Sequence, residues 1–449
     1  MTSGVIGERA VVIGAGIGGL AAAGALAPYF ERVVVLERDT LPSQPAHRAG
    51  TPQGRHLHSL LMSGLLALDQ LFPGFETDLA RAGAVPIKVG LDARVERWPY
   101  DPFPQRDLGY VSCAASRPTI EHTVRSRLEG IANATLRQHC RVRELVAVPG
   151  GTRVTGVRYE NPEGASETLP ADLVIDASGR GAPTLTFLQS IGQPLPEETT
   201  IGIDLHYSSC VFDSLCNAPT DWKGVFTLAN APEELRGGIM FPQEGNRWIV
   251  TLAGRHGVAM PSDHDSFLGY AQTLRTDTIY NAIKGAKPLS EVVRYATPES
   301  SLRHFERLDN FPQGLLPLGD AICRFNPTWA QGMSVAAQEA CLLHRLLDRL
   351  SDESDPIALL GSAFFTDIQP LLEAPWAVAM QDFVYPQTRG TRPADFETTL
   401  KFGAALNRIA ADDAAIHKLT LEVQHLLKPR SVFRDPELVQ RVMAEMAKM

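Results

Sequence analysis

Residues 10–39, AVVIGAGIGGLAAAGALAPYFERVVVLERD, are the stretch from which the rest of the chain can be interpreted. An apolar run ends at Ile13, and Gly14, Gly16 and Gly19 follow in G-x-G-x-x-G spacing before an alanine-rich segment of helical composition. The pattern predicts a strand, a tight turn and a helix whose first N–H groups face a pyrophosphate. Gly14 would permit the turn, Gly16 would let the backbone approach the phosphates, and Gly19 would let helix and strand pack.

A second apolar strand, residues 33–36, ends in Glu37, an acid at the distance from the glycines that a dinucleotide site requires. Such a carboxylate accepts hydrogen bonds from the ribose of an adenosine. Its charge also disfavours a 2′-phosphate, so the stretch predicts a site for FAD or NAD rather than for NADP.

The composition predicts a globular protein of two closely joined domains, because 449 residues can bury a large core. A formal net charge of −9 argues against nucleic acid or an anionic membrane as the main partner. No apolar run approaches the roughly 18 residues of a membrane helix, so no stable membrane insertion is expected. The cysteines form no C-x-x-C pair, which favours reduced thiols in a cytoplasmic protein. They stand at Cys113, Cys140, Cys210, Cys216, Cys323 and Cys341.

Three polar side chains mark the end of the loop that follows the second strand. Proline and glycine keep residues 41–54 in a loop, and leucine spacing predicts a helix from about His56 to Phe72. Arg55, His56 and His58 therefore lie at a loop-to-helix junction that could face a cofactor. A surface arginine and two helix-start histidines are the alternative. His-x-His could begin a metal site, but no third ligand cluster follows, so none is predicted.

Residues 85–111 mix β-branched residues, aromatic residues and prolines, which indicates an excursion into a second, sheet-containing domain. A helix follows, with Ser116 as its N-cap and Pro118 in its first turn. Arg117, at the entrance to that helix, could reach a phosphate or flavin edge, or could be an ordinary solvent-exposed arginine. Residues 141–148 and 154–159 then predict a hairpin.

Two later segments repeat the pattern of a buried strand that ends in small or acidic residues. Residues 171–183, ADLVIDASGRGAP, contain a strand that ends in Asp176-Ala-Ser-Gly, which allows close backbone approach or forms an ordinary turn. Residues 315–318 form a strand that ends at Gly319-Asp320, and a small-residue helix begins near Met333. Asp320 is placed to bond a ribityl hydroxyl, and the helix start offers N–H groups to a ring carbonyl.

Residues 195–297 contain short strands and turn signals, which predict an antiparallel sheet with one apolar face and a helix near 266–274. Such a sheet could cover an apolar ligand or serve only as a packing surface. Helical segments beyond residue 350 are expected to cap the substrate side. The predicted boundaries are 1–84, 112–190 and 298–350 for the dinucleotide-binding domain, 85–111 and 191–297 for the sheet domain, and 351–449 for a C-terminal helical region.

Together these segments resemble the class A flavoprotein monooxygenases, the fold group of para-hydroxybenzoate hydroxylase, over about residues 9–350. A closer likeness is to the actinobacterial branch that includes polyether polyene epoxidases. It rests on PQGRHLHSLL at 52–61, RWIVTLAG at 247–254, GDAICRFNPTWAQGMSVAA at 319–337 and HLLKPRSVFRDPELVQRV at 425–442. The resemblance implies an α/β fold with a Rossmann-type FAD-binding domain, an inserted antiparallel-sheet substrate domain and a helical C-terminal region.

The resemblance also implies FAD as the cofactor. Gly14, Gly16, Gly19 and Glu37 would hold its ADP half. The further residues that it implies around the cofactor are Arg38 beside the adenine, the backbone of Val142 at the adenine, Arg55 and Arg117 at phosphate or flavin, Asp320 at the ribityl or pyrophosphate region, and Pro327, Gly332 and Met333 against the isoalloxazine. Arg55, His58 and Trp329 are the candidates for the wall of the reaction chamber.

Two positions depart from the hydroxylase pattern. Ser178 stands where the hydroxylases usually have the Asp of Gly-Ala-Asp-Gly, which puts the handling of NAD(P)H by that motif in question. Trp329 and Ala330 stand where a tyrosine and a glycine usually precede Gln-Gly-Met, so a bulkier wall is expected beside the flavin.

The resemblance implies a monooxygenase in which NAD(P)H reduces FAD, O2 forms a C4a-hydroperoxyflavin, and one oxygen atom epoxidises or hydroxylates a lipophilic secondary metabolite such as a polyketide or terpenoid. The alternative is a non-redox cyclase of the same fold, similar to the spirotetramate decalin-forming cyclases, in which FAD maintains the pocket and a polyene is folded into a reactive conformer. Ser178, Trp329 and Ala330 motivate that alternative. A halogenase is disfavoured because the tryptophans form no W-x-W-x-I-P motif.

Overall fold

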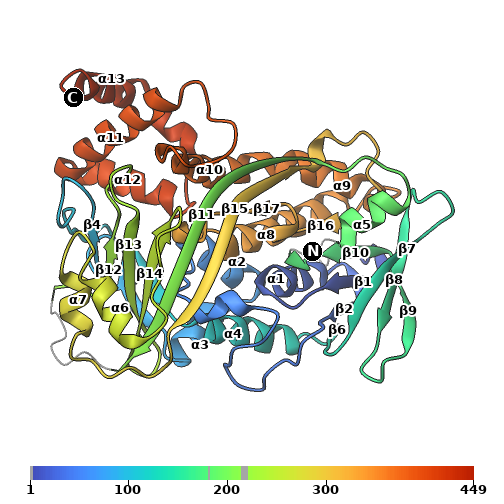
Figure 1. The fold of residues 1–449 in the computed structure, drawn as a ribbon. Coiled ribbons are helices and arrows are strands. Elements are labelled where there is room, and N and C mark those ends of the chain that lie inside the picture. Colours follow the sequence, from blue (N-terminus) through green and yellow to red (C-terminus); the bar gives the residue numbers. More distant parts are fainter. Residues whose placement is uncertain (1–3, 180–182, 214–220) are drawn as a thin grey trace.

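A computed structural model describes residues 4–179, 183–213 and 221–449 of the chain. Residues 180–182 of the second predicted strand-turn segment, and Cys216, lie outside the described residues. The described residues form two large sheets, two smaller ones and helices that include a C-terminal group (Figure 1). The predicted α/β architecture is confirmed.

A five-stranded parallel sheet forms the centre of the dinucleotide-binding part, in the order β16-β10-β1-β2-β6. Its strands are β1 (Gly7–Ile13), β2 (Phe30–Leu36), β6 (Ala134–Arg137), β10 (Leu173–Asp176) and β16 (Leu315–Pro317). Parallel strands of this kind are buried on both faces, which explains their continuous apolar runs. On one face α1 (Ile17–Leu26), α4 (Arg117–Glu129) and α8 (Gly332–Leu350) pack. On the other lies a three-stranded sheet, β7 (Arg141–Ala147), β8 (Val154–Glu160) and β9 (Ser166–Pro170).

Small residues let α8 lie very close to two other helices. A Cβ on Gly64 of α2 (Met62–Leu71) would lie 2.7 Å from the Cα of Ser334 on α8. A Cβ on Gly18 of α1 would lie 3.3 Å from the Cβ of Ala336. The alanine-rich composition of α8 is therefore explained largely by helix packing.

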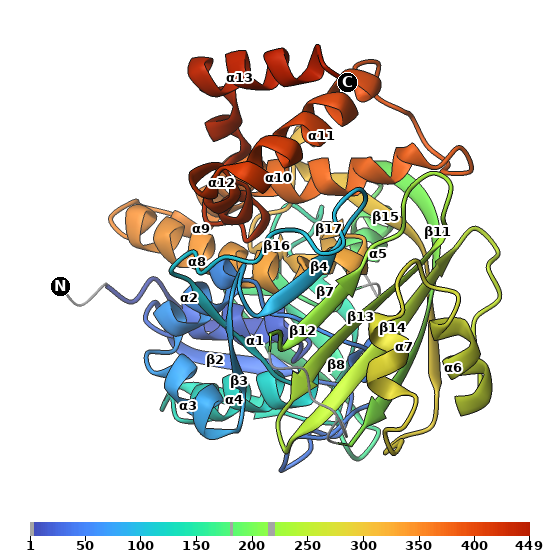
Figure 2. The same cartoon turned by 90° about the vertical axis from the view of Figure 1, so that its left-hand side faces the viewer.

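A seven-stranded sheet forms the second part, in the order β17-β15-β11-β14-β13-β12-β4. Its strands are β4 (Ala93–Glu96), β11 (Glu197–Phe212), β12 (Gly224–Thr227), β13 (Arg236–Gln243), β14 (Arg247–Arg255), β15 (Val293–His304) and β17 (Cys323–Arg324). All neighbours are antiparallel except β4 and β12. Helices α6 (His264–Ala271) and α7 (Thr278–Ile283) cover one face, and the sheet turns its other face inward (Figure 2).

The seven-stranded sheet crosses the predicted domain boundary at residue 297. Strand β15 continues past residue 297 to His304, and β17 comes from the segment assigned to the dinucleotide-binding domain. The excursion at 85–111 is divided as well, because β4 joins the large sheet while β3 (Val85–Lys88) pairs with β5 (Val111–Ala114). Long-range strand pairing, which composition does not encode, decides these boundaries.

The predicted helix over 56–72 is wrong in its first turn and a half. Residues 56–61 are extended, and α2 begins only at Met62. The backbone N–H of Leu57 donates to Thr251 Oγ1 at 3.1 Å, and that of Leu61 donates to Ser334 Oγ at 2.9 Å. These side chains, distant in sequence, satisfy the backbone groups that a helix would have bonded.

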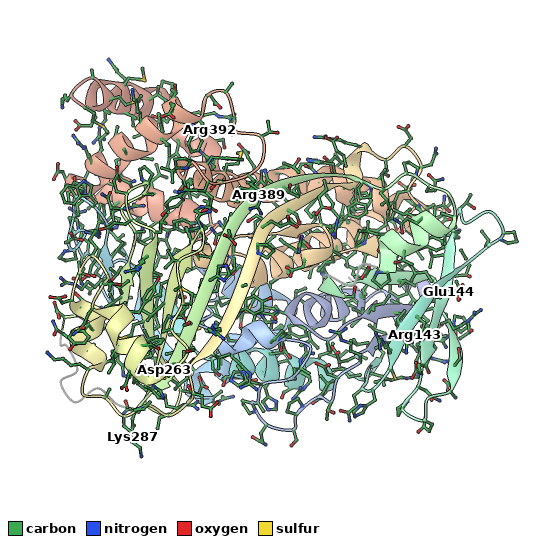
Figure 3. The ribbon with its side chains drawn as sticks, viewed as in Figure 1. Arg143, Glu144, Asp263, Lys287, Arg389 and Arg392 are labelled. Carbon is green, nitrogen blue, oxygen red and sulfur yellow. The ribbon has the colours of Figure 1, made fainter. Side chains whose placement is uncertain are left out.

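The C-terminal region is helical, as predicted, and lies over one end of both parts (Figures 1 and 2). Its α-helices are α9 (Pro356–Asp367), α10 (Gln369–Ala379), α11 (Phe396–Asp412), α12 (Ala414–Gln424) and α13 (Pro436–Met446). The segment between α10 and α11, which carries Arg389 and Arg392, runs beside β11 (Figure 3). The backbones of Arg389 and Gly202 exchange hydrogen bonds of 2.8 and 3.2 Å, which fix this segment to the large sheet.

The remaining α-helices are α3 (Phe75–Arg81) and α5 (Pro183–Ser190). Within the described part of the chain, none of the helices has the length and apolarity needed to span a bilayer.

Candidate functional site

A cavity of about 1870 Å³ runs between the parallel sheet, the seven-stranded sheet and the C-terminal helices. Its walls include Gly14 and Glu37 from the first part, Phe226 and Thr251 from the second, and Leu406 from α11. Sites for a single small molecule usually measure roughly 300–1,000 Å³. The cavity is therefore large enough for an extended cofactor together with a second ligand.

The three glycines of the first motif occupy three different environments. Gly14 has φ +98°, and a Cβ there would lie 2.8 Å from the carbonyl oxygen of Ala177. Gly16 is the N-cap of α1 and lines the cavity, with open space where its Cβ would be. Gly19 is not among the lining residues; a Cβ there would lie 1.9 Å from Gly14 O. Gly14 thus shapes the turn, Gly16 leaves room for a ligand, and Gly19 allows helix and turn to pack.

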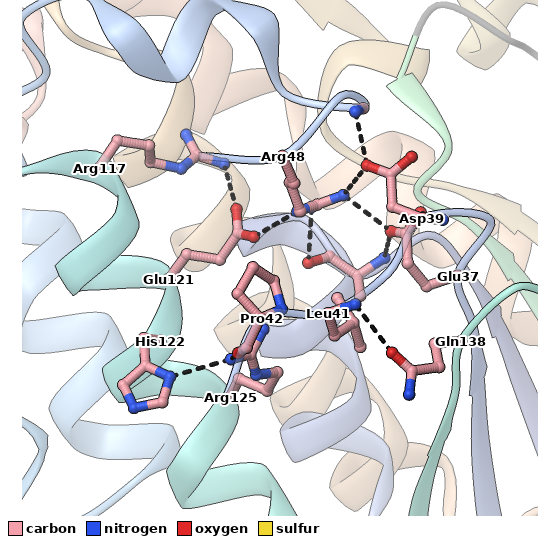
Figure 4. Close-up of polar contacts among 12 residues, drawn as sticks. Glu37, Asp39, Leu41, Pro42, Arg48, Arg117, Glu121, His122, Arg125 and Gln138 are labelled. Atoms are coloured by element: carbon pink, nitrogen blue, oxygen red, sulfur yellow. Dashed lines mark hydrogen bonds and ion pairs between the residues drawn. The ribbon is translucent and has the colours of Figure 1, made fainter. Parts of the chain in front are cut away.

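Glu37 is buried at the end of β2, where its carboxylate organises the glycine turn (Figure 4). Its two oxygens accept hydrogen bonds from the backbone N–H groups of Ala15 at 2.8 Å and Asp39 at 3.0 Å. The guanidinium of Arg48 lies 3.2 Å from the same carboxylate. Glu37 lines the cavity, so it can also meet a ligand there.

Arg48 joins three chain segments through one buried guanidinium (Figure 4). Besides Glu37, it contacts Asp39 at 3.0 Å and Glu121 of α4 at 2.6 Å, and it donates to the carbonyl of Ala15 at 3.1 Å. Burial alone would lower the pKa of Arg48, but the carboxylates around it raise that pKa above its ordinary value. Sequence reasoning missed Arg48, since nothing in a proline- and glycine-rich loop marks one arginine as a buried partner of three acids.

Arg117, at the start of α4, is the next cation along the cavity wall. Its Nη2 lies 3.3 Å from Glu121, the acid that also holds Arg48, while its buried Nε has no partner among the described residues. Ser116 caps the helix as predicted by accepting a hydrogen bond from the N–H of Thr119. Arg38 and Val142 line the same end of the cavity, so these three predicted cofactor residues are brought together.

The loop between β17 and α8 forms the middle of the cavity wall. Asp320, Pro327, Trp329, Gly332 and Met333 all line it, so the structure brings these predicted site residues together. Below this wall, Glu339 of α8 accepts a hydrogen bond of 2.6 Å from the backbone N–H of Gly319. Burial, together with the nearby charge of Asp320, raises the pKa of Glu339 to about 8.

Of the residues predicted at the junction before α2, the structure places the histidines in the cavity wall but leaves Arg55 out. Arg55 is exposed and is not among the residues that line the cavity, because it ends a 3-10 turn that points it outward. His56 Nδ1 lies 2.8 Å from Ser209 Oγ, and its ring packs beside Tyr207 and Tyr295.

Both histidines are neutral at physiological pH. Burial lowers the pKa of His56 to about 4, and burial with the charge of Arg117 lowers that of His58 to about 3. Neutral rings can serve as uncharged hydrogen-bonding walls. In the described ranges, no group of three or more His, Cys, Asp or Glu side chains is arranged to hold a metal ion.

Ser178, the departure in the second segment, is bound to the acid that precedes it. Its hydroxyl donates to Asp176 Oδ1 at 2.6 Å, and the other oxygen of Asp176 accepts hydrogen bonds from the N–H and hydroxyl of Thr184. Asp176 is fully buried. Ser178 therefore stabilises the end of β10 while also lining the cavity.

A buried network links the C-terminal region to the loop beside the cavity. Asp382, in the 3-10 turn after α10, contacts Arg255 of β14 at 2.7 Å and accepts a hydrogen bond of 2.6 Å from Asn326. Asn326 in turn accepts a hydrogen bond from the N–H of Thr328 at 3.0 Å. The position of the Pro327–Trp329 turn thus depends on both the large sheet and the C-terminal region.

The far end of the cavity is mainly apolar. Val95, Phe226 and Ile239 are register neighbours on β4, β12 and β13, and all three lie on the inner face of the large sheet. Opposite them stand Leu406 of α11 and Leu421 of α12. The sheet and the C-terminal helices both line the cavity, and their role as its substrate side stays a prediction.

The polar groups of the cavity wall from the glycine turn to the Pro327–Trp329 turn match those that FAD would need. Several buried polar atoms of the wall have no partner within the described part of the chain, and a buried polar atom without a partner costs free energy. They are Arg117 Nε, His56 Nε2, Trp329 Nε1 and Gln331 Oε1. Combined with the open N-terminus of α1 at Gly16, these groups suit a long ligand with phosphates, hydroxyls and a polar ring.

Comparison with known proteins agrees with this geometry. The profile of the FAD binding domain family matches residues 8–362. Protein Rv3254 of Mycobacterium tuberculosis is 33% identical over 357 residues, which cover 76% of this chain and 73% of that protein.

Two solved structures share the fold at low sequence identity. The flavin-dependent brominase Bmp2 has a TM-score of 0.67 and 13% identity, covering 98% of this chain and 99% of Bmp2. The p-nitrophenol 4-monooxygenase PnpA of Pseudomonas putida has a TM-score of 0.64 and 17% identity, covering 95% and 99%. The chain therefore belongs to the FAD binding domain family and has the fold shared by class A flavin monooxygenases and flavin-dependent halogenases.

Proposed function

We propose that the protein is an FAD-dependent monooxygenase that transfers one oxygen atom from O2 to a lipophilic small molecule by epoxidation or hydroxylation. The observation that carries this proposal is the single continuous cavity, which begins at the glycine turn, passes the Pro327–Trp329 turn and ends at an apolar chamber. A cofactor site joined directly to an apolar substrate site is what flavin oxygenation of a lipophile requires.

Each group of residues has a role that follows from its position. The N-terminus of α1 and Arg117 would bind the phosphates, Glu37 the adenosine ribose, and Asp320 the ribityl chain. FAD, when bound, supplies hydride acceptance from NAD(P)H and activation of O2. Pro327, Gly332 and Met333 would orient the ring, and the apolar chamber would exclude water.

The finer assignment is to the epoxidase-like branch, with a polyketide or terpenoid as substrate in a cytoplasmic natural-product pathway. It is supported by the sequence segments at 52–61 and 425–442, since His58 and His425 from those segments both line the cavity. Burial lowers the pKa of His425 to about 4, so this histidine is uncharged, while Arg430 and Arg434 of the same segment also line the cavity.

The second candidate is a non-redox cyclase that retains FAD as part of the pocket wall. The specific observation in its favour is Ser178, whose hydroxyl is already bonded to Asp176 and which replaces an acid tied to use of NAD(P)H. In that case catalysis would come from folding a flexible polyene into one reactive conformer.

Anaerobic stopped-flow mixing of the purified holoprotein with NADH and with NADPH separates these candidates. We expect the absorbance of oxidised flavin to fall within the assay with at least one of them, and to fall faster when farnesoic acid or its methyl ester is present as a lipophilic alkene. Isotopically labelled O2 should then leave one labelled atom in the product, detected by mass spectrometry. Reduction by dithionite but by neither nicotinamide, with or without the alkenes, would eliminate the monooxygenase and favour the cyclase.

A further inference from the structure

Arg97 places a cationic group in the cavity wall beside the apolar side chains of β4, β12 and β13. Residues alternate along β4 and just beyond it, so Ala93, Val95 and Arg97 line the cavity while Glu96 points to the opposite side. There Glu96 is fully buried and accepts hydrogen bonds from three threonine hydroxyls. The acid next to Arg97 in sequence is therefore not its partner.

The guanidinium of Arg97 makes one side-chain hydrogen bond within the described part of the chain, to Asn407 Oδ1 of α11 at 2.8 Å. No carboxylate of the described residues forms an ion pair with it. Burial lowers the pKa of Arg97, although an arginine stays charged at neutral pH. By contrast, the cavity-lining Arg117 and Arg324 are paired with Glu121 and Glu299.

His417 on α12 is a titratable residue of the same cavity lining. The C-terminal region also adds the charged residues Glu373, Asp395, Arg430 and Arg434 to that lining, and Glu373 lies 3.5 Å from Arg434. Burial, with the charge of Arg106, lowers the pKa of His417 to about 4, so that ring is neutral. The wall residues of this end are Val95, Phe103, Phe226, Leu228, Ile239 and Leu406.

We propose that Arg97, oriented by Asn407, binds a carboxylate on the lipophilic substrate, so that the substrate class is an unsaturated carboxylic acid rather than a neutral hydrocarbon, alcohol or ester. Five N–H donors in a planar fork match a carboxylate with two parallel hydrogen bonds, and only one donor is used by Asn407. Arg97 is partly buried, and a partly desolvated charge without an ionic partner is less stable than a paired one, so an anionic ligand group would stabilise it. The inference rests on the proposed function of the same cavity.

A purely structural role, tethering α11 to the sheet, is the competing explanation of Arg97. The structure already contains such a tether in Arg106, which donates to the carbonyls of Ala410 at 2.9 Å and of Ala411. Arg106 is not among the cavity-lining residues. It is therefore the matched control for Arg97, because it binds α11 from the loop that follows β4 and is not among the cavity-lining residues.

The test compares farnesoic acid, its methyl ester and farnesol as probes of the FAD-loaded protein at pH 8, where the acid is ionised. Binding is followed by perturbation of flavin fluorescence and by calorimetry in the wild type, Arg97→Met, Arg97→Lys and Arg106→Met. We expect the wild type to bind the acid at least tenfold more tightly than the ester. Arg97→Met should abolish that preference, Arg97→Lys should keep part of it, and Arg106→Met should keep it while lowering thermal stability.

Two outcomes would overturn the inference, and they differ in what else they affect. The first outcome is that the ester and the alcohol bind as tightly as the acid, or that Arg97→Met keeps the preference for the acid at unchanged FAD content. Arg97 then does not recognise the carboxylate, but the proposed lipophilic substrate is not contradicted. The second outcome is that none of the three probes binds while NAD(P)H still reduces the flavin. Both the carboxylate inference and the proposed lipophilic substrate class are then wrong, but the proposed reduction of FAD by NAD(P)H is not contradicted.

Discussion

At the scale of single residues, Arg48 is the group on which the largest number of buried charges depends. Its guanidinium is 6% exposed and contacts the carboxylates of Glu37, Asp39 and Glu121. Removing one partner of a buried ion pair leaves the other charge without compensation. Glu37 and Arg48 line the predicted ribose and phosphate end of the cavity, so stability and cofactor binding are coupled there.

We predict that Arg48→Met lowers the free energy of unfolding by about 3–5 kcal/mol, because it leaves buried carboxylates unpaired. The substitution should also lower the FAD content of the purified protein, because the combined negative charge of the unpaired carboxylates would repel the phosphates of FAD. Urea unfolding and the flavin-to-protein absorbance ratio measure both effects. The control is Arg143→Met on β7, whose ion pair with Glu160 is exposed (Figure 3), and which should change stability by less than about 0.5 kcal/mol. Equal effects of the two substitutions would contradict the role of Arg48.

Glu339 gives a second prediction, for pH dependence. Its pKa rises from 4.5 unfolded to about 8 folded, because burial disfavours the charged form. Between these values the folded state binds one more proton than the unfolded state, so this group makes stability fall as pH rises, by roughly 1.4 kcal/mol per pH unit.

We expect Glu339→Gln, which keeps a carbonyl oxygen for the N–H of Gly319, to remove this dependence. Melting temperatures of the wild type and the variant, measured from pH 5 to pH 8, should diverge in favour of the variant as pH rises. A constant difference over that range would show that Glu339 titrates normally in the folded protein.

At the scale of elements, two glycines three residues apart have different roles in the turn between β1 and α1. We expect Gly19 to be needed for folding and Gly16 to be needed for ligand binding. At Gly19 a Cβ would lie 1.9 Å from a backbone oxygen, whereas at Gly16 it would meet no atom within 4 Å. We predict that Gly19→Ala lowers both thermal stability and FAD content. Gly16→Ala should leave the circular dichroism and melting temperature of the FAD-free protein unchanged but weaken FAD binding at least tenfold, measured by titration. Tight FAD binding by Gly16→Ala would place the phosphates elsewhere.

The Asp382 network belongs to the same scale, because it joins the C-terminal region, β14 and the Pro327–Trp329 turn. Asp382→Ala should destabilise the protein by about 3–5 kcal/mol and loosen the turn, since Arg255 and Asn326 both lose their partner. Iodide quenching of flavin fluorescence should rise, since the ring would be less well covered. The control is Glu397→Ala, which removes the exposed partner of Arg392 in the nearby linking segment. Unchanged quenching in a destabilised Asp382→Ala would limit the network to a structural role.

At the scale of the whole molecule, the cavity lies between three parts of the chain, so a ligand inside it binds only the folded arrangement. FAD should therefore stabilise the protein by mass action, by about 2.7 kcal/mol when its concentration is a hundred times its dissociation constant. Removing FAD should lower the melting temperature, and adding it back should restore the value with a logarithmic dependence on concentration. A melting temperature that ignores added FAD would mean that the cavity does not bind it.

The sequence by itself determined the local elements of the dinucleotide-binding part. Short apolar runs that alternate with glycines and acids predicted β1, α1, β2 and the loop before α8. These elements could be predicted because they depend on neighbouring residues and on backbone conformations that glycine allows and most other residues do not. The resemblance extended this to FAD, to the sheet domain and to some of the residues that line the cavity.

Only the tertiary structure decided which distant residues meet. Contacts between residues far apart in the sequence decide the place of Arg48 among three acids, Asp382 beside Asn326, the non-helical segment 56–61, the outward Arg55 and Arg97 beside Asn407. The physical reason is that burial and pairing of charges are set by long-range packing, while sequence spacing records only what a residue does within its own turn, helix or strand.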